Sequence, residues 1–316
     1  MSQKKIDVLV VGELNIDLIM DKLEQFPQVG KEIIANRMHL TLGSSSAIFA
    51  SNLSVLGSRV SFCGCVGQDN FADKITFDLS SKGVQVDHII RSTTSDTGVT
   101  VTFNFHEDRA MVTYPGAMNE LCCENITDQM LEEATHLHVS SIFLQPALKP
   151  GLENLFRRAR QKGLTTSMDP QWDPTEEWDL NKEKLLPEID IFLPNLEELK
   201  NITGQSTIEN CLNTIQAHSN IVVVKNGRAG ARLQKEAITI EQEAFLNTDI
   251  VDTIGAGDSF NAGFIHSYLQ GKPLQECMRV GALCGAINTT GSGGTTAFDN
   301  YDNLIELAMQ KFNTCL

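Results

Sequence analysis

The chain has 316 residues, enough for one large domain or two modest ones and far too many for a small disulfide-held scaffold. Hydrophobic residues make up 41% of it and charged residues 21%, a balance that supports a sizeable core and excludes wholesale disorder. Acidic side chains number 40 against 25 Lys and Arg, and the resulting net charge of −15 disfavours a nucleic-acid partner. No stretch approaches the roughly 18 uninterrupted apolar residues that a membrane span needs.

The chain begins with a predicted strand. Asp7 interrupts the first apolar run and Glu13 follows it closely, which is not the pattern of a secretory signal peptide. None of the eight cysteines forms a C-x-x-C pair, so we expect buried or incidental thiols in a reducing, cytoplasmic setting.

Short β-branched runs then alternate with segments of helical period along almost the whole chain. This pattern predicts an α/β fold in which helices cover a mainly parallel sheet, built as a single domain over residues 1–316. The predicted strands are Val8–Val11, Val60–Cys65, Leu137–Ser140, Thr165–Asp169, Ile189–Leu193 and Ile221–Lys225. Helices are signalled most clearly over Pro150–Gly163 and Asp258–Gln270.

Two strand-rich segments, about 33–42 and 98–114, interrupt this alternation. In the second, Val99, Val101 and Phe103 alternate with polar residues before a turn at 107–109, which predicts a hairpin. Together the two segments predict a small second sheet that serves as a lid over a cleft. Its alternating apolar face leads us to expect a homodimer through the lid.

The segment Val251–Phe260 carries the strongest chemical signal. Gly255 and Gly257 precede a predicted helix, where inward-turned backbone N–H groups and the helix dipole favour an anion. Asp258 would repel a bound phosphate, but it suits a base that takes the proton of a hydroxyl attacking a phosphoryl group. A tight turn followed by a helix-stabilising acid is the simpler interpretation of the same residues.

Two other nucleotide-binding signatures do not fit this chain. The P-loop pattern G-x-x-x-x-G-K-[ST] does not occur. Phe260 stands where the third glycine of a dinucleotide fingerprint would fall, which disfavours an oxidoreductase.

From about Ile6 to the last helix, the chain resembles the ribokinase-like sugar kinases of the PfkB carbohydrate kinase family. The segment Asp252–Phe260 resembles the C-terminal signature of that family. The resemblance implies a three-layer α/β/α domain with a small β lid, and transfer of the γ-phosphate of ATP to a hydroxyl of a small sugar. It further implies an anion hole at Gly255, Ala256 and Gly257, with Asp258 as the catalytic base.

Other segments that follow in the order of the family imply sites for both substrates and for cations. The implied sugar contacts are Asn15, Asp17, Gly43, Ser44, Ser45 and Arg109 of the lid. The implied nucleotide contacts are Asn195, Lys225, Gly227, Gly230 and Asn288. Glu198 would hold Mg²⁺ through water, and Asp252 would lie near a monovalent cation such as K⁺. Simpler interpretations are a helix cap at Asn195, a loop acid at Asp17 and a solvent-reaching side chain at Lys225.

The chain also departs from the family pattern. Ser44 and Ile48 replace a glycine and a sugar-contacting asparagine, so a deoxy sugar, or a sugar that presents another face, is a candidate acceptor. Gln171 and Asp173 stand where many relatives have asparagine and arginine, which disfavours an acidic sugar unless Arg109 substitutes.

Three further alternatives stay open. A nucleoside kinase of the same family is one, and a non-catalytic nucleotide or sugar sensor is another, although a sensor has no use for a base at Asp258. His136 and His138 would share one strand face and suggest a metal pair, but no third ligand is evident nearby.

Overall fold

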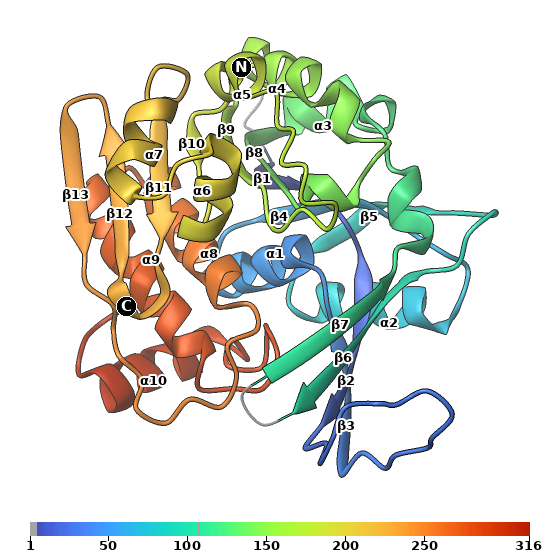
Figure 1. Ribbon diagram of the computed structural model, residues 1–316. Helices are drawn as coiled ribbons and strands as arrows, with labels where there is room; N and C mark the ends of the chain where they lie inside the picture. The colour runs from blue at the N-terminus through green and yellow to red at the C-terminus, as the bar shows by residue number, and fades with distance from the viewer. Residues whose placement is uncertain (1–4, 106–107) are drawn as a thin grey trace.

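The computed structural model describes residues 5–105 and 108–316 (Figure 1). A nine-stranded sheet forms the centre, in the order β13-β12-β11-β10-β9-β8-β1-β4-β5. Its strands are β1 (Ile6–Val11), β4 (Val60–Val66), β5 (Gln85–Arg91), β8 (Ala134–Ser140), β9 (Thr165–Asp169), β10 (Ile191–Phe192), β11 (Ile221–Lys225), β12 (Ala231–Lys235) and β13 (Ile238–Gln242). Neighbours from β11 to β5 run parallel, and β12 and β13 add an antiparallel edge. The predicted mainly parallel α/β sheet is confirmed.

Helices cover both faces of this sheet. One face carries α1 (Ser45–Val55), α2 (Asn70–Ser81), α8 (Ala256–Leu269), α9 (Leu274–Asn288) and α10 (Tyr301–Phe312). The other carries α3 (Asp128–Glu133), α4 (Leu152–Gln161), α5 (Lys182–Leu185), α6 (Leu196–Thr203) and α7 (Ile208–Ile215).

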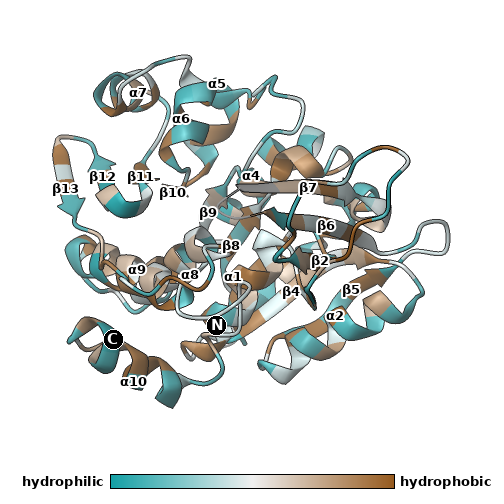
Figure 2. Cartoon of the chain, turned by 60° about the horizontal axis from the view of Figure 1, so that its bottom comes forward, coloured by the Kyte–Doolittle hydropathy of each residue, from teal (hydrophilic) through white to brown (hydrophobic). Residues whose placement is uncertain are grey.

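Strand β1 shows why the core has two halves. Val8 and Val10 lie in the core of the α8 face, whereas Leu9 and Val11 lie in the core of the α4 face, because successive side chains of a strand point to opposite sides. The outer helices carry both hydrophilic and hydrophobic residues, as α6 and α7 show in Figure 2. The three-layer architecture is therefore confirmed.

A second, four-stranded sheet projects from the main body, in the order β3-β2-β6-β7 (Figure 1). Its strands are β2 (Asn15–Asp21), β3 (Arg37–Leu42), β6 (Gly98–Phe105) and β7 (Asp108–Tyr114). The predicted lid segments supply β3, β6 and β7. Asn15 and Asp17 lie in β2, an inner strand of this sheet, so the simpler interpretation of Asp17 as a loop acid is wrong. The apolar residues Ile16, Leu18, Ile19 and Met20, interrupted only by Asp17, are the strand signal that sequence reasoning missed.

Several predicted boundaries shift by a few residues. The strand predicted over Ile189–Leu193 is reduced to β10, and the helix predicted from Asp258 begins at Ala256. Part of the turn predicted at 107–109 lies outside the described residues, and Asp108 already pairs with Phe105. Across residues 5–105 and 108–316, no helix has the length and apolarity to cross a membrane.

The parallel strands bring their carboxyl ends to one edge of the sheet. Gly12 follows β1, Ser141 follows β8, Pro170 follows β9 and Asn226 follows β11. In open parallel sheets, ligands bind beyond this edge, where the strand order reverses. The predicted functional residues of the main domain gather there.

Candidate active site

A cavity of about 470 Å³ opens at this edge, against the N-terminus of α8. The predicted site residues that line it are Asn195, Glu198, Lys225, Gly227, Gly230, Gly255, Ala256, Gly257 and Asp258. Its apolar lining includes Phe245, Leu246, Ile250, Ala282 and Ala286. The cavity therefore joins a polar end at α8 to an apolar end suited to a flat organic ring.

The turn before α8 needs glycine. Gly255 has φ of 77°, and a Cβ there would lie 2.6 Å from Cα of Gly294. This turn leads directly into a helix of 14 residues, whose N-terminus carries partial positive charge toward the cavity.

Asp258 lies in the first turn of α8 and is almost fully buried. Burial raises the pKa of its carboxyl group well above the usual value, and the negative charge of Asp169 raises it further. The positive charge of Lys225 and a hydrogen bond from Ser45 oppose that rise. A carboxylate held at a raised pKa at the cavity wall has the properties of a general base.

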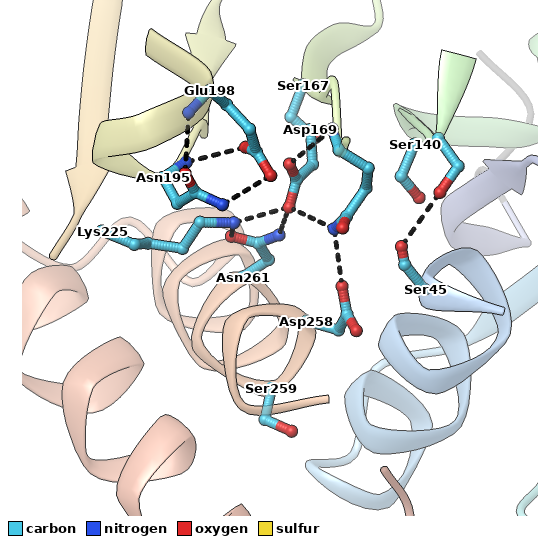
Figure 3. Close-up of polar contacts among 12 residues, drawn as sticks. Ser45, Ser140, Ser167, Asp169, Asn195, Glu198, Lys225, Asp258, Ser259 and Asn261 are labelled. Atoms are coloured by element: carbon cyan, nitrogen blue, oxygen red, sulfur yellow. Dashed lines mark hydrogen bonds and ion pairs between the residues drawn. The ribbon is translucent and has the colours of Figure 1, made fainter. Parts of the chain in front are cut away.

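A buried ion pair lies beside this base. Lys225 Nζ lies 2.5 Å from Asp169 Oδ2, and Asn261 Nδ2 donates to the same oxygen at 2.5 Å (Figure 3). Asp169 is completely buried, and 11% of the Lys225 side chain is exposed, at the cavity wall. The charge of Lys225 is thus paired with a buried carboxylate, and its side chain still reaches the cavity. Sequence reasoning assigned no role to Asp169 or Asn261, although Asp169 ends a predicted strand at the edge where sites form.

Asn195 and Glu198 form a reciprocal cap at the start of α6. The Glu198 N–H donates to Asn195 Oδ1 at 2.9 Å, and the Asn195 N–H donates to Glu198 Oε2 at 2.8 Å. The Asn195 side chain also donates to Glu198 Oε1 at 2.6 Å. Burial raises the pKa of Glu198 to about 7, and the charge of Asp169 adds to that effect. The cap interpretation is therefore correct, and the same pair also lines the cavity.

Glu198 is chemically suited to a hydrated Mg²⁺. The ion prefers oxygen ligands and keeps several of its waters, so a carboxylate at a cavity wall holds it through those waters and the phosphates of a nucleotide. Each carboxylate oxygen of Glu198 accepts one hydrogen bond from Asn195, which leaves a second lone pair on each oxygen for water.

Three of the predicted sugar contacts, Asn15, Asp17 and Gly43, lie together where the lid joins the main domain. Asn15 Nδ2 donates to Asp17 Oδ1 at 2.9 Å and to Thr100 Oγ1 at 3.0 Å. Asp17, Thr41, Thr100 and Thr113 pair across the lid strands and so form a polar row on one face of the lid.

Close packing at Gly43 brings the lid acid near the main domain. A Cβ at Gly43 would overlap the carboxylate of Asp17, so only glycine allows this approach. Burial raises the pKa of Asp17 to about 6, with repulsion from Glu13 and Asp252 adding to the rise. The bond from Asn15 opposes it.

The serines predicted to touch sugar have different surroundings. Ser44 Oγ caps α1 by accepting the Ala47 N–H at 3.0 Å, and it donates to the Glu13 carbonyl at 2.6 Å, so it shapes the turn. Ser45 Oγ lies 3.1 Å from Ser141 Oγ and hydrogen-bonds to Asp258. Ser45 is therefore the serine that lies close to the base.

Glu13 is a buried acid that sequence reasoning did not assign to the site. Ser46 Oγ donates to its Oε2 at 2.5 Å, and burial raises the pKa of this carboxyl group. Its charge raises the pKa of both Asp17 and Asp258, so the three carboxyl groups are electrostatically linked.

Two predicted site residues, Asn288 and Asp252, make hydrogen bonds within the loops around the start of α8. Asn288 is fully buried, donates to the Ile254 carbonyl at 2.6 Å and accepts from Ser259 Oγ at 3.0 Å. Its predicted nucleotide contact is thus replaced by support of the turn before α8. The carboxylate of Asp252 accepts the N–H groups of Ile254 at 3.0 Å and Gly293 at 2.8 Å.

The structure also shows the surroundings of the two histidines considered as a metal pair, and of two residues expected near the sugar. His136 and His138 share the hydroxyl of Ser167 at 2.7 Å, and burial lowers the pKa of both rings, so they form a neutral core network. Ile48 is buried against Gly294. Arg109 lies in β7, but its side chain falls outside the described part of the chain.

Comparisons with known proteins find carbohydrate kinases among the proteins that this chain is similar to. A family model described as pfkB family carbohydrate kinase matches residues 5–300. An uncharacterised sugar kinase from Archaeoglobus fulgidus is 29% identical over 238 residues, which cover 74% of this chain and 92% of that protein. A deoxyribokinase from Salmonella typhi is 25% identical over 307 residues, with 95% and 98% covered. A structure from E. coli in complex with ATP and Mg²⁺ superposes with a TM-score of 0.83 at 22% identity, covering 96% of this chain and 99% of that one.

Proposed function

The chain belongs to the pfkB family of carbohydrate kinases, and on that premise we propose how its residues transfer the γ-phosphate of ATP to a sugar hydroxyl. The observation that carries the proposal is the position of Asp258, a buried carboxylate of raised pKa in the first turn of α8 and at the wall of the cavity. A binding module has no need of such a group, whereas a phosphotransferase needs a base for the acceptor.

The chemical step uses Asp258 and the N-terminus of α8. The acceptor hydroxyl gives its proton to Asp258 while its oxygen forms a bond to the γ-phosphorus, and the bond between that phosphorus and ADP breaks. The Gly255–Gly257 turn and the helix dipole stabilise the charge on the transferring group. Closure of the lid excludes water, which would otherwise accept the phosphoryl group.

The nucleotide occupies the cavity. Its ring lies among the apolar residues near Phe245 and Ile250, and its phosphates extend toward Lys225 and the start of α8. Glu198 orients the waters of Mg²⁺, which supplies charge neutralisation at the phosphates when bound. We also propose a monovalent cation such as K⁺ near the Asp252 loop, and a reducing, cytoplasmic setting supported by the eight free cysteines.

The acceptor is identified by an ADP-release screen with purified protein and Mg-ATP. The panel holds pentoses, hexoses, 2-deoxy sugars, keto-deoxy acids and nucleosides. We expect release that depends on a sugar, with deoxy pentoses among the best acceptors because Ile48 offers no hydrogen bond. ADP release that depends only on nucleosides would show a nucleoside kinase of the same family. No ADP release with any compound of the panel would contradict the proposal.

Replacing Asp17 with alanine separates sugar binding from ATP binding. Loss of a hydrogen bond to a charged group should raise the KM for sugar about 10- to 100-fold, while the KM for ATP changes little. Steady-state kinetics with each substrate varied in turn measures both constants. Asp21→Ala, near the other end of β2, is the matched control and should alter neither. Equal changes in both KM values for Asp17→Ala would remove Asp17 from the sugar site.

The lid also offers a surface for a second copy of the chain. The lid has an apolar face on the side opposite Asp17, as the register of its strands shows. This apolar lid face consists of Leu18, Met20, Met38, Leu40, Val101, Phe103, Val112 and Tyr114. Its outer members are well exposed, with Met38 at 60% and Val112 at 64%. An apolar sheet face of this kind, opposite a polar substrate face, favours an isologous homodimer.

Sedimentation analysis tests the dimer. Wild-type protein should sediment at twice the chain mass of 34.8 kDa, and Leu40→Lys should shift it to the monomer mass because a charge would be buried in the interface. Val29→Lys, at a fully exposed position outside the apolar lid face, is the control and should remain dimeric. A wild-type monomer at all accessible concentrations would rule out this interface.

A further inference from the structure

Gln171 has an unusual position in this site. It follows β9 directly, has φ of 60°, and its side chain lines the cavity. Glutamine rarely adopts this left-handed conformation, which costs energy for a residue with a Cβ. Such a conformation persists where surrounding contacts hold it, and the side-chain contacts of Gln171 are with the catalytic end of the cavity.

The carboxamide of Gln171 connects two carboxylates. Its Nε2 donates to Asp258 Oδ1 at 3.0 Å and to Asp169 Oδ2 at 3.0 Å. An amide nitrogen has two hydrogens, so each carboxylate can receive one of them. Asp169 is already paired with Lys225, and the amide therefore links the base to a buried ion pair.

Without this link, the base would face negative charge. The charged groups that act on Asp258 are Asp169 from β9, Lys225 from β11 and Glu13 from the segment after β1. Both acids disfavour ionisation of Asp258, and Lys225 favours it. A neutral amide that donates to both Asp169 and Asp258 reduces their repulsion and favours the ionised base.

We propose that Gln171 is a positioning residue that holds Asp258 Oδ1 and leaves Oδ2 to receive the proton of the acceptor hydroxyl. This inference rests on the proposed function, since it assigns a role around the same base. The left-handed backbone at Gln171 aims the amide at both carboxylates, and its strain is offset by the two hydrogen bonds.

The test is the pH profile of kcat for Gln171→Gly. Glycine accepts the left-handed backbone, so the variant removes the amide without adding strain. We expect kcat to fall about 10- to 100-fold, the effect of losing a hydrogen bond to a charged group. The acidic limb of the profile should move to higher pH, because Asp258 loses a donor that favours its ionised form. The KM for ATP should change little.

Glu176→Gly is the matched control. Glu176 lies in the same loop, also with a positive φ of 57°, and is exposed, so this variant makes the same backbone change away from the base. It should retain the wild-type profile. The isosteric Gln171→Glu should shift the acidic limb further than Gln171→Gly, because it places another carboxyl group between Asp169 and Asp258.

The outcomes separate this inference from the proposed function. An acidic limb that stays in place in both Gln171 variants would overturn the positioning role, even if kcat falls. A merely structural defect lowers kcat without changing the pKa of Asp258. In that case sugar-dependent turnover by wild-type protein would leave the proposed function standing. Absence of sugar turnover by wild-type protein would overturn both.

Discussion

Asp258→Asn is expected to lower kcat by about 100- to 10,000-fold, the usual contribution of a general base. Asparagine has the shape of aspartate but cannot accept the hydroxyl proton, so binding of ATP and sugar should be retained. Steady-state kinetics, together with calorimetric titration of each substrate, separates the two effects. Unchanged turnover would remove Asp258 from the chemical step.

The same variant should remain folded. Folding raises the pKa of Asp258, so its ionisation opposes folding as pH rises through that value, and stability is greatest below it. Removing the charge should therefore leave the melting temperature at alkaline pH equal to or higher than that of wild type. A lower melting temperature there would show that the ionised carboxylate is stabilised by contacts that asparagine does not reproduce.

Lys225→Met is expected to have the largest effect on stability. It would leave Asp169 as a completely buried carboxylate without its cation, which costs about 3–5 kcal/mol in the free energy of unfolding. Turnover should fall as well, since Lys225 opposes the rise in the pKa of Asp258. Chemical denaturation followed by circular dichroism measures the first effect.

Two further variants test whether the ion pair is the cause. Lys225→Met combined with Asp169→Asn removes both charges and should recover much of the lost stability, because no unpaired charge stays buried. Lys200→Met breaks the 2.7 Å surface pair with Glu197 and should cost under about 1 kcal/mol. Equal losses for Lys225→Met and Lys200→Met would contradict a special role for the buried pair.

The sequence predicted the parts of the fold that depend on periodicity. Each of the strands predicted at Thr165–Asp169 and Ile221–Lys225 matches an observed strand, since short β-branched runs between helical segments are typical of a parallel sheet covered by helices. The turn at Gly255 and the place of Asp258 at the start of the following helix were also predicted, because glycine spacing before a helix has a direct structural meaning. These features are local in the chain.

Features that depend on packing between distant segments were not predictable in the same way. Asp169, Lys225 and Asn261 lie on three different elements. Only the fold brings Lys225 and Asn261 to the same carboxylate oxygen of Asp169. Asn288 was expected to touch the nucleotide, but its burial behind α8 follows from how α9 packs on α8. Glu13 was passed over because an acid after a strand usually faces solvent, whereas here α1 covers it.

We propose above all that Asp258 directs the phosphoryl group of ATP to a sugar and not to water. Phosphorus NMR of a reaction with Mg-ATP and the best acceptor from the screen tests it most directly. We expect a new phosphomonoester signal that grows in step with ADP for wild-type protein and is absent for Asp258→Asn over the same time. Inorganic phosphate in place of that signal, or equal product from both proteins, would contradict it.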